Sequence, residues 1–269
     1  MVQTRRAPPS RRSFLLCSLP LVLLAGATPP AAAWGPTGHR VVGKVAEGYL
    51  SATSRRAVED LLAPDSLAES ATWADDIRPD PASAPYENWH WVNIDDGQDL
   101  TLEPGNHQGE LLRALDAQRT TLCDRTKTKE QRRDAVRWLA HLIGDMHQPL
   151  HIGKATDRGG NYELVLWQDQ ASNLHDVWDN RMIDSTKVSF SEFVEFLDPP
   201  SAGDVAAWKV GTFLDWAKES QTLRKAAYEI GDGRLSYKYA WVHLPTVRKR
   251  LQQAGVRLAS VLEQCLGNH

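Results

Sequence analysis

Cysteine is scarce in this sequence of 269 residues, which contains only Cys17, Cys123 and Cys265. Neither Cys123 nor Cys265 lies beside the histidines that could bind a metal, so thiolate ligands are excluded. Cys17 belongs to an N-terminal segment that we expect to be removed. In an oxidising compartment the other two are expected to form a disulfide between the C-terminal helix and the middle of the chain; two free buried thiols are the alternative.

Linkers, internal repeats and long apolar runs are also missing. Proline and glycine are scattered, and no low-complexity stretch divides the chain. Setting aside the first 33 of the 269 residues leaves 236, which is enough for one large core, so we expect one domain over residues 34–269. No stretch after residue 33 is long and apolar enough to cross a bilayer. We therefore expect no stable membrane association. We also expect a monomer.

A surplus of positive charge is missing too. Residues 1–33 hold four arginines and no acid, so without them 27 basic side chains face 34 acidic ones, a net charge of −7. This balance is unusual for a protein that holds nucleic acid by a basic patch. If the chain binds phosphate, metal ions must supply the positive charge.

The first 33 residues have the pattern of a signal peptide. Four arginines precede an apolar run at 14–25 that is too short to span a membrane, and residues 31–33 (AAA) form an A-x-A cleavage site. Residues 10–14 (SRRSF) are a twin-arginine pattern, which favours export by the Tat route; an ordinary Sec signal is the alternative. We expect an exported protein, periplasmic or secreted, whose mature chain begins at Trp34.

Helical periodicity dominates the remaining chain. The clearest helix should begin after Thr128, which can form a capping box with Gln131, and should end just after His147. His141 and Asp145 are four residues apart, so we expect them to share a face at the edge of the apolar stripe, half shielded from water. We expect His147 to orient the helix end rather than bind metal.

The other expected elements are mostly helices as well. The last helix should run from about Tyr239 to Leu266, with these side chains facing inward: Trp241, Leu244, Val247, Leu251, Leu258 and Val261. Shorter helices are expected near 38–50, 54–63, 106–122, 173–183, 204–219 and 221–229. Residues 159–167 alternate enough for a small β-hairpin near 160–167. The fold class is therefore mostly α, a single multi-helix domain whose helices project ligands into a shared cleft.

Side chains that bind metals recur in short blocks along the chain. The blocks are Trp34 with His39, Asp75, His90, His141 with Asp145 and His151, and His175 with Asp179. Nitrogen and oxygen donors without thiolate suit zinc in catalytic sites. A single His-x-x-x-Asp pair at helical spacing is more often a surface hydrogen bond or a capped core histidine. Two such pairs with further histidines and a terminal amine favour a metal centre.

Together the blocks resemble the single-strand-specific three-zinc nucleases of fungi, plants and bacteria, which are similar in fold to bacterial zinc phospholipases C. The resemblance covers essentially the whole mature chain, and all nine ligand positions occur in the family's order and spacing. The segments that carry it are 34–39 (WGPTGH), 73–78 (WADDIR), 90–93 (HWVN), 141–151 (HLIGDMHQPLH), 159–161 (GGN) and 173–179 (NLHDVWD).

The resemblance implies three Zn²⁺ ions. The first would be held by Asp75, His90, His141 and Asp145. The second would be held by His39 and the amine and carbonyl of Trp34, with Asp145 bridging to the first. The third, more open ion would be held by His151, His175 and Asp179.

The resemblance also implies the chemistry. A zinc-bridged hydroxide would attack phosphorus in line, the third zinc would stabilise the leaving 3′-oxygen, and the products would carry 5′-phosphates. Asp75 would orient the hydroxide and Arg78 would stabilise charge on the phosphoryl oxygens; an ion pair of Arg78 with Asp76 or Asp80 is the alternative. Removal of 3′-phosphates from nucleotides is a further expected activity.

Base binding should depend on stacking, because every unpaired base exposes a π-face. Trp91 is the candidate platform, with core packing as the alternative, and Asn161 is a candidate hydrogen-bonding partner. Many fungal and plant relatives have an aspartate at the position of Asn93, so base preference here should be weaker or different.

The leading hypothesis is a secreted zinc-dependent endonuclease whose substrates are single-stranded RNA, single-stranded DNA and nucleotides. A zinc-dependent phospholipase C would use the same metals on another phosphodiester. In those enzymes, however, the N-terminal histidine lies much further from the terminal Trp, and the last ligand pair ends in Glu where Asp179 stands. A non-catalytic zinc-binding protein is the other alternative, but such a protein has no need of Arg78.

Overall fold

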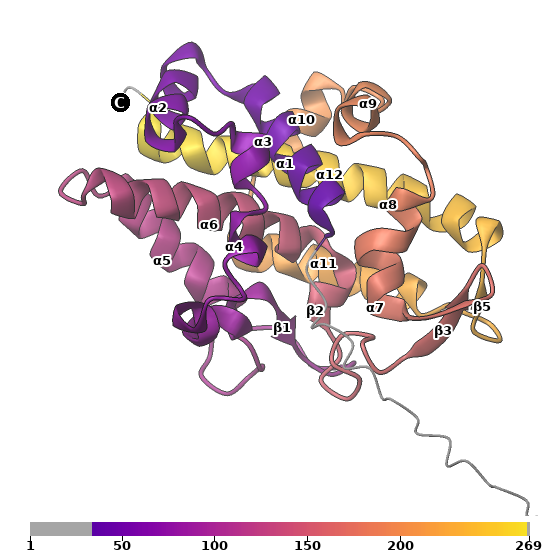
Figure 1. The fold of residues 1–269 in the computed structure, drawn as a ribbon. Coiled ribbons are helices and arrows are strands. Elements are labelled where there is room, and N and C mark those ends of the chain that lie inside the picture. Colours follow the sequence, from indigo (N-terminus) through magenta and orange to yellow (C-terminus); the bar gives the residue numbers. More distant parts are fainter. Residues whose placement is uncertain (1–33, 268–269) are drawn as a thin grey trace, which may run out of the picture. The chain divides into compact units, whose positions relative to one another are not determined.

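The protein is built mainly of helices in its computed structural model, which describes residues 34–267 (Figure 1). The helices are α1 (Pro36–Tyr49), α2 (Ala52–Leu62), α3 (Leu67–Ser70), α4 (Trp73–Asp76), η1 (Pro81–His90), α5 (Leu111–Cys123), α6 (Lys129–His147), η2 (Pro149–His151), α7 (Leu174–Asp176), η3 (Val177–Arg181), α8 (Met182–Asp184), α9 (Phe190–Glu195), α10 (Ala202–Trp208), α11 (Phe213–Ala227) and α12 (Tyr237–Leu266). The short strands are β1 (Val92–Asn93), β2 (Ile152–Gly153), β3 (Leu164–Trp167), β4 (Gln170–Asn173) and β5 (Arg234–Leu235). The predicted mostly-α class is confirmed, whereas the predicted signal peptide at 1–33 lies outside the described residues.

Helix α6 carries two of the predicted ligands, His141 and Asp145, and it forms as the sequence predicts. Thr128 and Gln131 make the predicted capping box, and the helix ends at His147, before Pro149. Its apolar stripe is buried at 5% exposure or less, with α5 and α12 packed against it. The stripe consists of Ala135, Trp138, Leu139, Leu142, Ile143 and Met146. Burial of this stripe fixes which face of α6 is turned inward.

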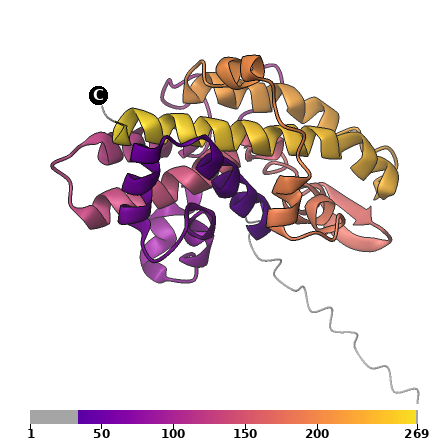
Figure 2. The same ribbon diagram turned by 90° about the horizontal axis from the view of Figure 1, so that it is seen from above.

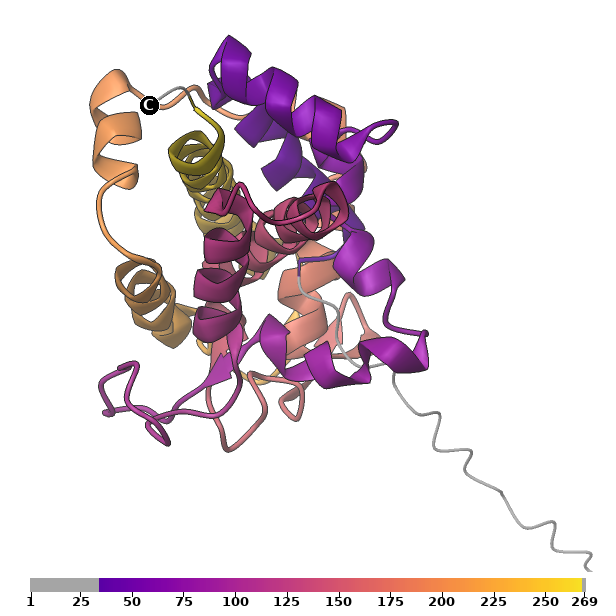
Figure 3. The same ribbon diagram turned by 90° about the vertical axis from the view of Figure 1, so that its left-hand side faces the viewer.

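Helix α12 runs through the core, with α1 alongside it (Figure 2). Seen along its length in Figure 3, it has other helices around it on several sides. The predicted inward positions from Val247 to Val261 are buried, but Trp241 is 78% exposed, so that prediction was wrong. The first turns of α12 bury Ala240 and His243 instead. Trp241 therefore points away from the core, because successive residues are about 100° apart around a helix.

Several predicted helix boundaries were also wrong. The expected helix at 106–122 begins only at Leu111, and the expected break at residue 220 is absent. The break falls between α10 and α11 instead, where Gly211 has a φ of +104°. Thr212 then begins α11 with a capping box to Asp215. Glycine tolerates this left-handed conformation, so the turn forms there rather than inside the apolar pattern.

The predicted hairpin exists but lies further along the chain than expected. Strand β3 pairs antiparallel with β4 through a turn at Gln168 and Asp169, both of which have positive φ, and β5 adds in parallel. Residues 159–163 are not strand, because Gly159 and Gly160 turn the chain with φ values of +65° and +82°. A second, two-residue sheet joins β1 to β2 in parallel, with Val92 opposite Ile152.

The predicted disulfide is present between Cys123 and Cys265, whose Cα atoms are 4.4 Å apart. It ties the end of α5 to the end of α12 across 142 residues of sequence. Within residues 34–267, no helix combines the length and the apolar character needed to cross a membrane.

Candidate metal centre

The predicted ligands come from seven separate segments, and the structure brings their side chains together. His39 lies on α1, Asp75 on α4, His90 at the end of η1 and His151 at the end of η2. Helix α6 supplies His141 and Asp145, and α7 and η3 supply His175 and Asp179. All of these side chains are buried except Asp75, which keeps 16% of its side chain exposed. His141 and Asp145 were expected to be half shielded, but both are fully buried, because every residue of α6 from 138 to 147 is covered.

Asp145 lies between two groups of nitrogen atoms. Its Oδ1 is 3.3 Å from His39 Nε2, and its Oδ2 is 3.1 Å from His90 Nδ1 and 3.5 Å from His141 Nε2. Asp75 Oδ1 approaches His141 Nε2 at 3.7 Å from the other side. One carboxylate with an oxygen toward each group has the arrangement expected of a bridge between two metal ions.

A third group is formed by His151, His175 and Asp179. The two Nε2 atoms are 3.1 Å apart, and Asp179 places its oxygens 3.7 Å from His151 Nε2 and 3.1 Å from His175 Nε2. All three side chains are buried, so this group is no more exposed than the others. If a zinc ion binds here, its open coordination positions would come from its having only three protein ligands.

Main-chain carbonyls fix how three of the histidines present their nitrogens. The Nδ1–H of His141 donates to Ala71 O at 2.9 Å, and the Nδ1–H groups of His151 and His175 donate to His90 O and Gly159 O at 2.6 Å. Because a carbonyl can only accept, each neutral ring then directs the Nε2 lone pair inward. In the third group two lone pairs face each other at 3.1 Å, so a proton or a metal ion has to lie between them.

The donor atoms fit zinc. Zinc–nitrogen bonds of ~2.05 Å in a tetrahedral site separate neighbouring ligand atoms by ~3.3 Å. The closest pairs within the three groups are 3.1–3.7 Å apart, and all ligand atoms of a group lie within 4.8 Å of one another. Both His39 ring nitrogens, Asp145 Oδ1 and Asp179 Oδ2 are buried without a hydrogen-bond partner among the described residues. Such atoms are costly to bury unless a ligand satisfies them, which a metal ion would do.

Burial sets the protonation states that a metal needs. Burial, reinforced by the neighbouring His141, lowers the pKa of His39 and of His90 well below the usual value, so both rings are neutral at pH 7. Burial and the charge of Asp75 raise the pKa of Asp145 well above its ordinary value. An unprotonated carboxylate at this position therefore requires a nearby cation.

Trp34 lies directly against this centre. Its side chain is fully buried, and the N–H of Gly35 donates to Asp179 O at 2.7 Å. A Cβ on Gly35 would lie 1.9 Å from Asn180 Oδ1, so glycine permits the close approach of this segment to η3. The start of the expected mature chain is thereby held beside Asp179, one of the predicted ligands.

Arg78 lies at the edge of the centre. Its Nη1 donates to Asp75 Oδ1 at 3.2 Å, and its side chain is 20% exposed. Asp76 accepts from Thr72, and Asp80 accepts from the N–H of Ala82. The guanidinium is therefore next to a predicted ligand and within reach of solvent.

The predicted base-binding residues have different environments. Trp91 is partly exposed, which argues against simple core packing, and Gly109 passes so close that a Cβ there would lie 2.6 Å from the Trp91 ring. Asn93 is only 7% exposed and belongs to β1. Asn161 is partly exposed and donates to Arg158 O at 2.8 Å. Trp91 and Asn161 are thus accessible, whereas Asn93 is largely covered.

Sequence reasoning missed the residues that orient the ligands. Fully buried Gln148 donates to Asp179 Oδ1 at 2.7 Å and accepts from the N–H of Leu150. Its position between His147 and Pro149 gave no indication of a partner 31 residues away. The predicted role of His147 agrees with its contacts: Nδ1 donates to Ile143 O, and Nε2 faces Arg257.

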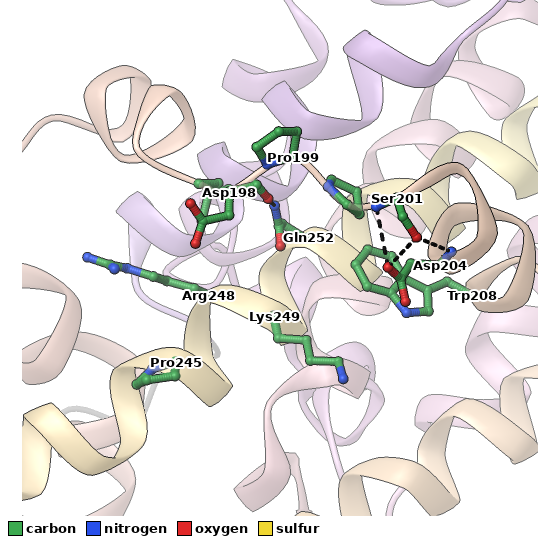
Figure 4. A pocket seen from close by; sticks show the side chains of 11 residues that line it. Asp198, Pro199, Ser201, Asp204, Trp208, Pro245, Arg248, Lys249 and Gln252 are labelled. Atoms are coloured by element: carbon green, nitrogen blue, oxygen red, sulfur yellow. Dashed lines mark hydrogen bonds between the residues drawn. The ribbon is translucent and has the colours of Figure 1, made fainter.

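A pocket of about 430 Å³ lies elsewhere, along α12 (Figure 4). Trp208, Pro245, Arg248 and Lys249 form part of its wall, and Gln252 donates across it to Asp198 O. No predicted ligand lines this pocket. The chemistry of the buried donor atoms, rather than this cavity, identifies the candidate site.

Comparison with known proteins confirms the resemblance found in the sequence. Residues 34–267 match the family described as S1/P1 nuclease. Endonuclease 2 and Endonuclease 5 of Arabidopsis thaliana are 29% and 31% identical to this chain, over 91% and 87% of it and 95% and 90% of their own lengths. Nuclease S1 of Aspergillus oryzae is 25% identical over 86% of this chain and 91% of its own length.

Proposed function

Because the chain belongs to the S1/P1 nuclease family and is thus a phosphodiester-hydrolysing enzyme, we propose that it is an exported, zinc-dependent endonuclease acting on single-stranded RNA and DNA. Its products would carry 5′-phosphates, and 3′-nucleotides would be dephosphorylated as well. The observation that carries the proposal is the convergence of three groups of buried His and Asp atoms at separations that suit zinc. No basic patch is needed, since the metal ions would supply the positive charge.

Nine residues would hold three zinc ions in this proposal. Asp75, His90, His141 and Asp145 would hold the first; Trp34, His39 and Asp145 the second; and His151, His175 and Asp179 the third. The two oxygens of Asp145, which face His39 on one side and His90 on the other, support its role as the bridge. The buried position of Trp34 beside Asp179 supports a contribution from its amine and carbonyl.

The bound ions would supply an activated water and positive charge for the departing oxygen. Asp75 would orient the attacking group, since its carboxylate, at 16% exposure, is more exposed than the proposed His and Asp ligands around it. Arg78 would stabilise charge that develops on the phosphoryl oxygens. Its donor bond to Asp75 holds the guanidinium beside that carboxylate, where an incoming phosphate can meet both.

Substrate selection would depend on stacking of an unpaired base on Trp91, which follows the ligand His90 directly. A paired base is already stacked within its duplex, so single strands would be preferred. Asn161 would hydrogen-bond the base edge. Asn93 carries both a donor and an acceptor, so base preference would be weaker or different from that of relatives with aspartate there. The relatives named above are nucleases and endonucleases, which favours this substrate over a phospholipid.

Export would activate the enzyme. Residues 1–33 would direct export, and their removal would free the amine of Trp34 to act as a ligand. The disulfide between Cys123 and Cys265 supports an oxidising destination, periplasmic or extracellular. A precursor, or a protein with one extra residue before Trp34, should therefore hold an incomplete zinc set and show little activity. Full zinc content and full activity of the extended protein would contradict this part of the proposal.

The direct test is digestion of a short single-stranded oligonucleotide by protein that begins at Trp34, with the product ends identified. We expect release of 5′-mononucleotides that a chelator abolishes and added zinc restores. His175→Ala, which should lose the third ion, is the matched inactive control. If zinc-loaded protein leaves the oligonucleotide intact but hydrolyses a phospholipid, the substrate assignment is wrong.

A further inference from the structure

Helix α11 supplies none of the proposed zinc ligands, yet it contacts the main chain of three segments that do. Its buried face includes Trp216, Ser220 and Arg224, spaced four residues apart. Ser220 Oγ donates to Met146 O on α6, one residue after the proposed bridging ligand Asp145. Arg224 contacts the strands that follow His90 and His151. The inner face of α11 therefore carries two polar side chains, Ser220 and Arg224, among apolar ones.

Arg224 makes the most extensive of these contacts. Its side chain is 2% exposed, and its Nη1 lies 2.7 Å from Ile94 O, 3.1 Å from Ile152 O and 2.7 Å from Gly153 O. Its Nη2 donates to Asp96 Oδ1 at 2.6 Å. One guanidinium thus joins Ile94, directly after β1, to both residues of β2.

The two strands place ligands of different zinc ions next to each other. His90 precedes β1 by one residue, and His151 directly precedes β2. The strands pair over two residues only, and the His151 Nδ1–H donates to His90 O at 2.6 Å. So short a parallel pair has little stability of its own. The N–H of Ile94 also donates to Gly153 O, and Arg224 adds contacts to carbonyl groups on both sides of the pair.

We propose that Arg224 is a positioning residue of the metal centre, which holds β1 against β2 and so sets the separation of His90 and His151. The inference rests on the proposed function for the assignment of these histidines as ligands of the first and third zinc ions. Arg224 touches neither ion nor substrate in this scheme. It acts through the two strands, and the bond from His151 to His90 transmits the spacing.

An arginine suits this task for a geometric reason. Its planar guanidinium has five N–H donors in a fixed fork, so it can serve several carbonyls and a carboxylate at once. A lysine keeps the charge but has a single nitrogen on a flexible chain. Arg224→Lys therefore removes the fork while leaving the charge opposite Asp96.

The test is zinc affinity, measured by chelator competition on the full mature protein, together with the visible spectrum of the cobalt-substituted form. We expect Arg224→Lys to bind zinc at least ~10-fold more weakly, as is usual for loss of a residue that orients metal ligands. The cobalt bands should shift because the ligand geometry changes. Val261→Ala, in the core near the end of α12, is the control for a general loss of stability and should keep the normal affinity and spectrum.

A folded Arg224→Lys protein with unchanged zinc affinity and an unchanged cobalt spectrum would overturn the proposal. If Arg224→Lys does not fold, Asp96→Asn provides the same test in milder form, because it removes the charge that pairs with Arg224, weakens the bond from Nη2 and leaves the carbonyl contacts. We expect a smaller weakening in the same direction, and normal affinity in Asp96→Asn would then refute the role. A wild-type protein that binds zinc but cleaves no nucleic acid would defeat the proposed function and leave this measurement valid.

Discussion

Replacing Asp145, the proposed bridging carboxylate, by its neutral isostere asparagine should change stability in opposite directions with and without zinc. Asp145 is fully buried, and burial and the charge of Asp75 raise its pKa well above the usual value. Neighbouring histidines offer no compensation at pH 7, since the pKa values of His39 and His90 are lowered, chiefly by burial. Without metal, the folded state must either bury an unpaired charge or take up a proton. Asp145→Asn removes that cost.

The sign of the pH dependence follows from the raised pKa. Because the pKa of Asp145 is higher in the folded than in the unfolded state, the protonated carboxyl contributes stability to the metal-free protein at pH values below the unfolded pKa of about 3.9. This contribution is lost as the pH rises through the folded pKa. Metal-free Asp145→Asn should therefore match the wild type near pH 4 and exceed it at pH 7 by at least ~1 kcal/mol, the low end for relieving a buried unsatisfied group. For a chain of this size, that is a rise in Tm of roughly 2–4 °C.

With zinc bound, the wild type should instead be the more stable of the two proteins. A ligand at 1,000 times its Kd stabilises the folded state by about 4 kcal/mol, or roughly 8–16 °C in Tm, for each ion bound. Asp145 would contact two of the three ions, so the variant should lose most of the stabilisation from both. Thermal unfolding of both proteins at pH 7, with excess chelator and with saturating zinc, measures all four values. The reasoning is refuted if metal-free Asp145→Asn is the less stable protein, or if zinc raises both Tm values equally.

Three further predictions concern other parts of the molecule. Arg78→Ala should leave the zinc content unchanged but lower kcat/KM by a factor equivalent to about 3 kcal/mol; unchanged turnover would remove Arg78 from the mechanism. Cys265→Ser, which frees Cys123, should lower the free energy of unfolding by up to about 5 kcal/mol because the disulfide closes a long loop, as urea denaturation would show; equal midpoints would contradict this. Glu219 accepts from the buried guanidinium of Arg257, so Glu219→Gln should destabilise the protein by about 2 kcal/mol. Burial raises the pKa of Glu219, but the pairing with Arg257 outweighs it, so the pKa is lowered. The difference in unfolding free energy between variant and wild type should therefore shrink as pH falls below about 4.5. A difference that does not change with pH would be evidence against the pairing.

The elements that sequence reasoning predicted well are those fixed by neighbouring residues. The capping box of Thr128 and Gln131 depends on residues three apart, and the end of α6 depends on Pro149. The buried stripe of α6 follows from helical spacing alone. The ligand blocks were recognisable because their order and spacing match a family, and the family match over residues 34–267 confirms that resemblance.

The predictions were wrong where the local sequence was compatible with two structures. The pattern in the first turns of α12 allowed Trp241 to face inward, and only the packing of neighbouring elements decided for Ala240 and His243. The break near residue 220 was placed by apolar periodicity, whereas Gly211 had the conformational freedom to turn the chain. The hairpin was displaced for the same reason, since Gly159 and Gly160 turn the chain before β3 begins.

By itself the sequence determined the chemical character of the centre: which donor atoms are present, that no cysteine takes part, and which helix carries His141 and Asp145 on one face. The tertiary structure alone decided how those donors are used. Gln148 meets Asp179 across 31 residues, and Arg224 meets Ile94 across 130. Such contacts depend on how the whole chain packs, because hydrogen-bond geometry between distant segments is set by the elements that bury them. This geometry cannot be read from any local pattern of residues.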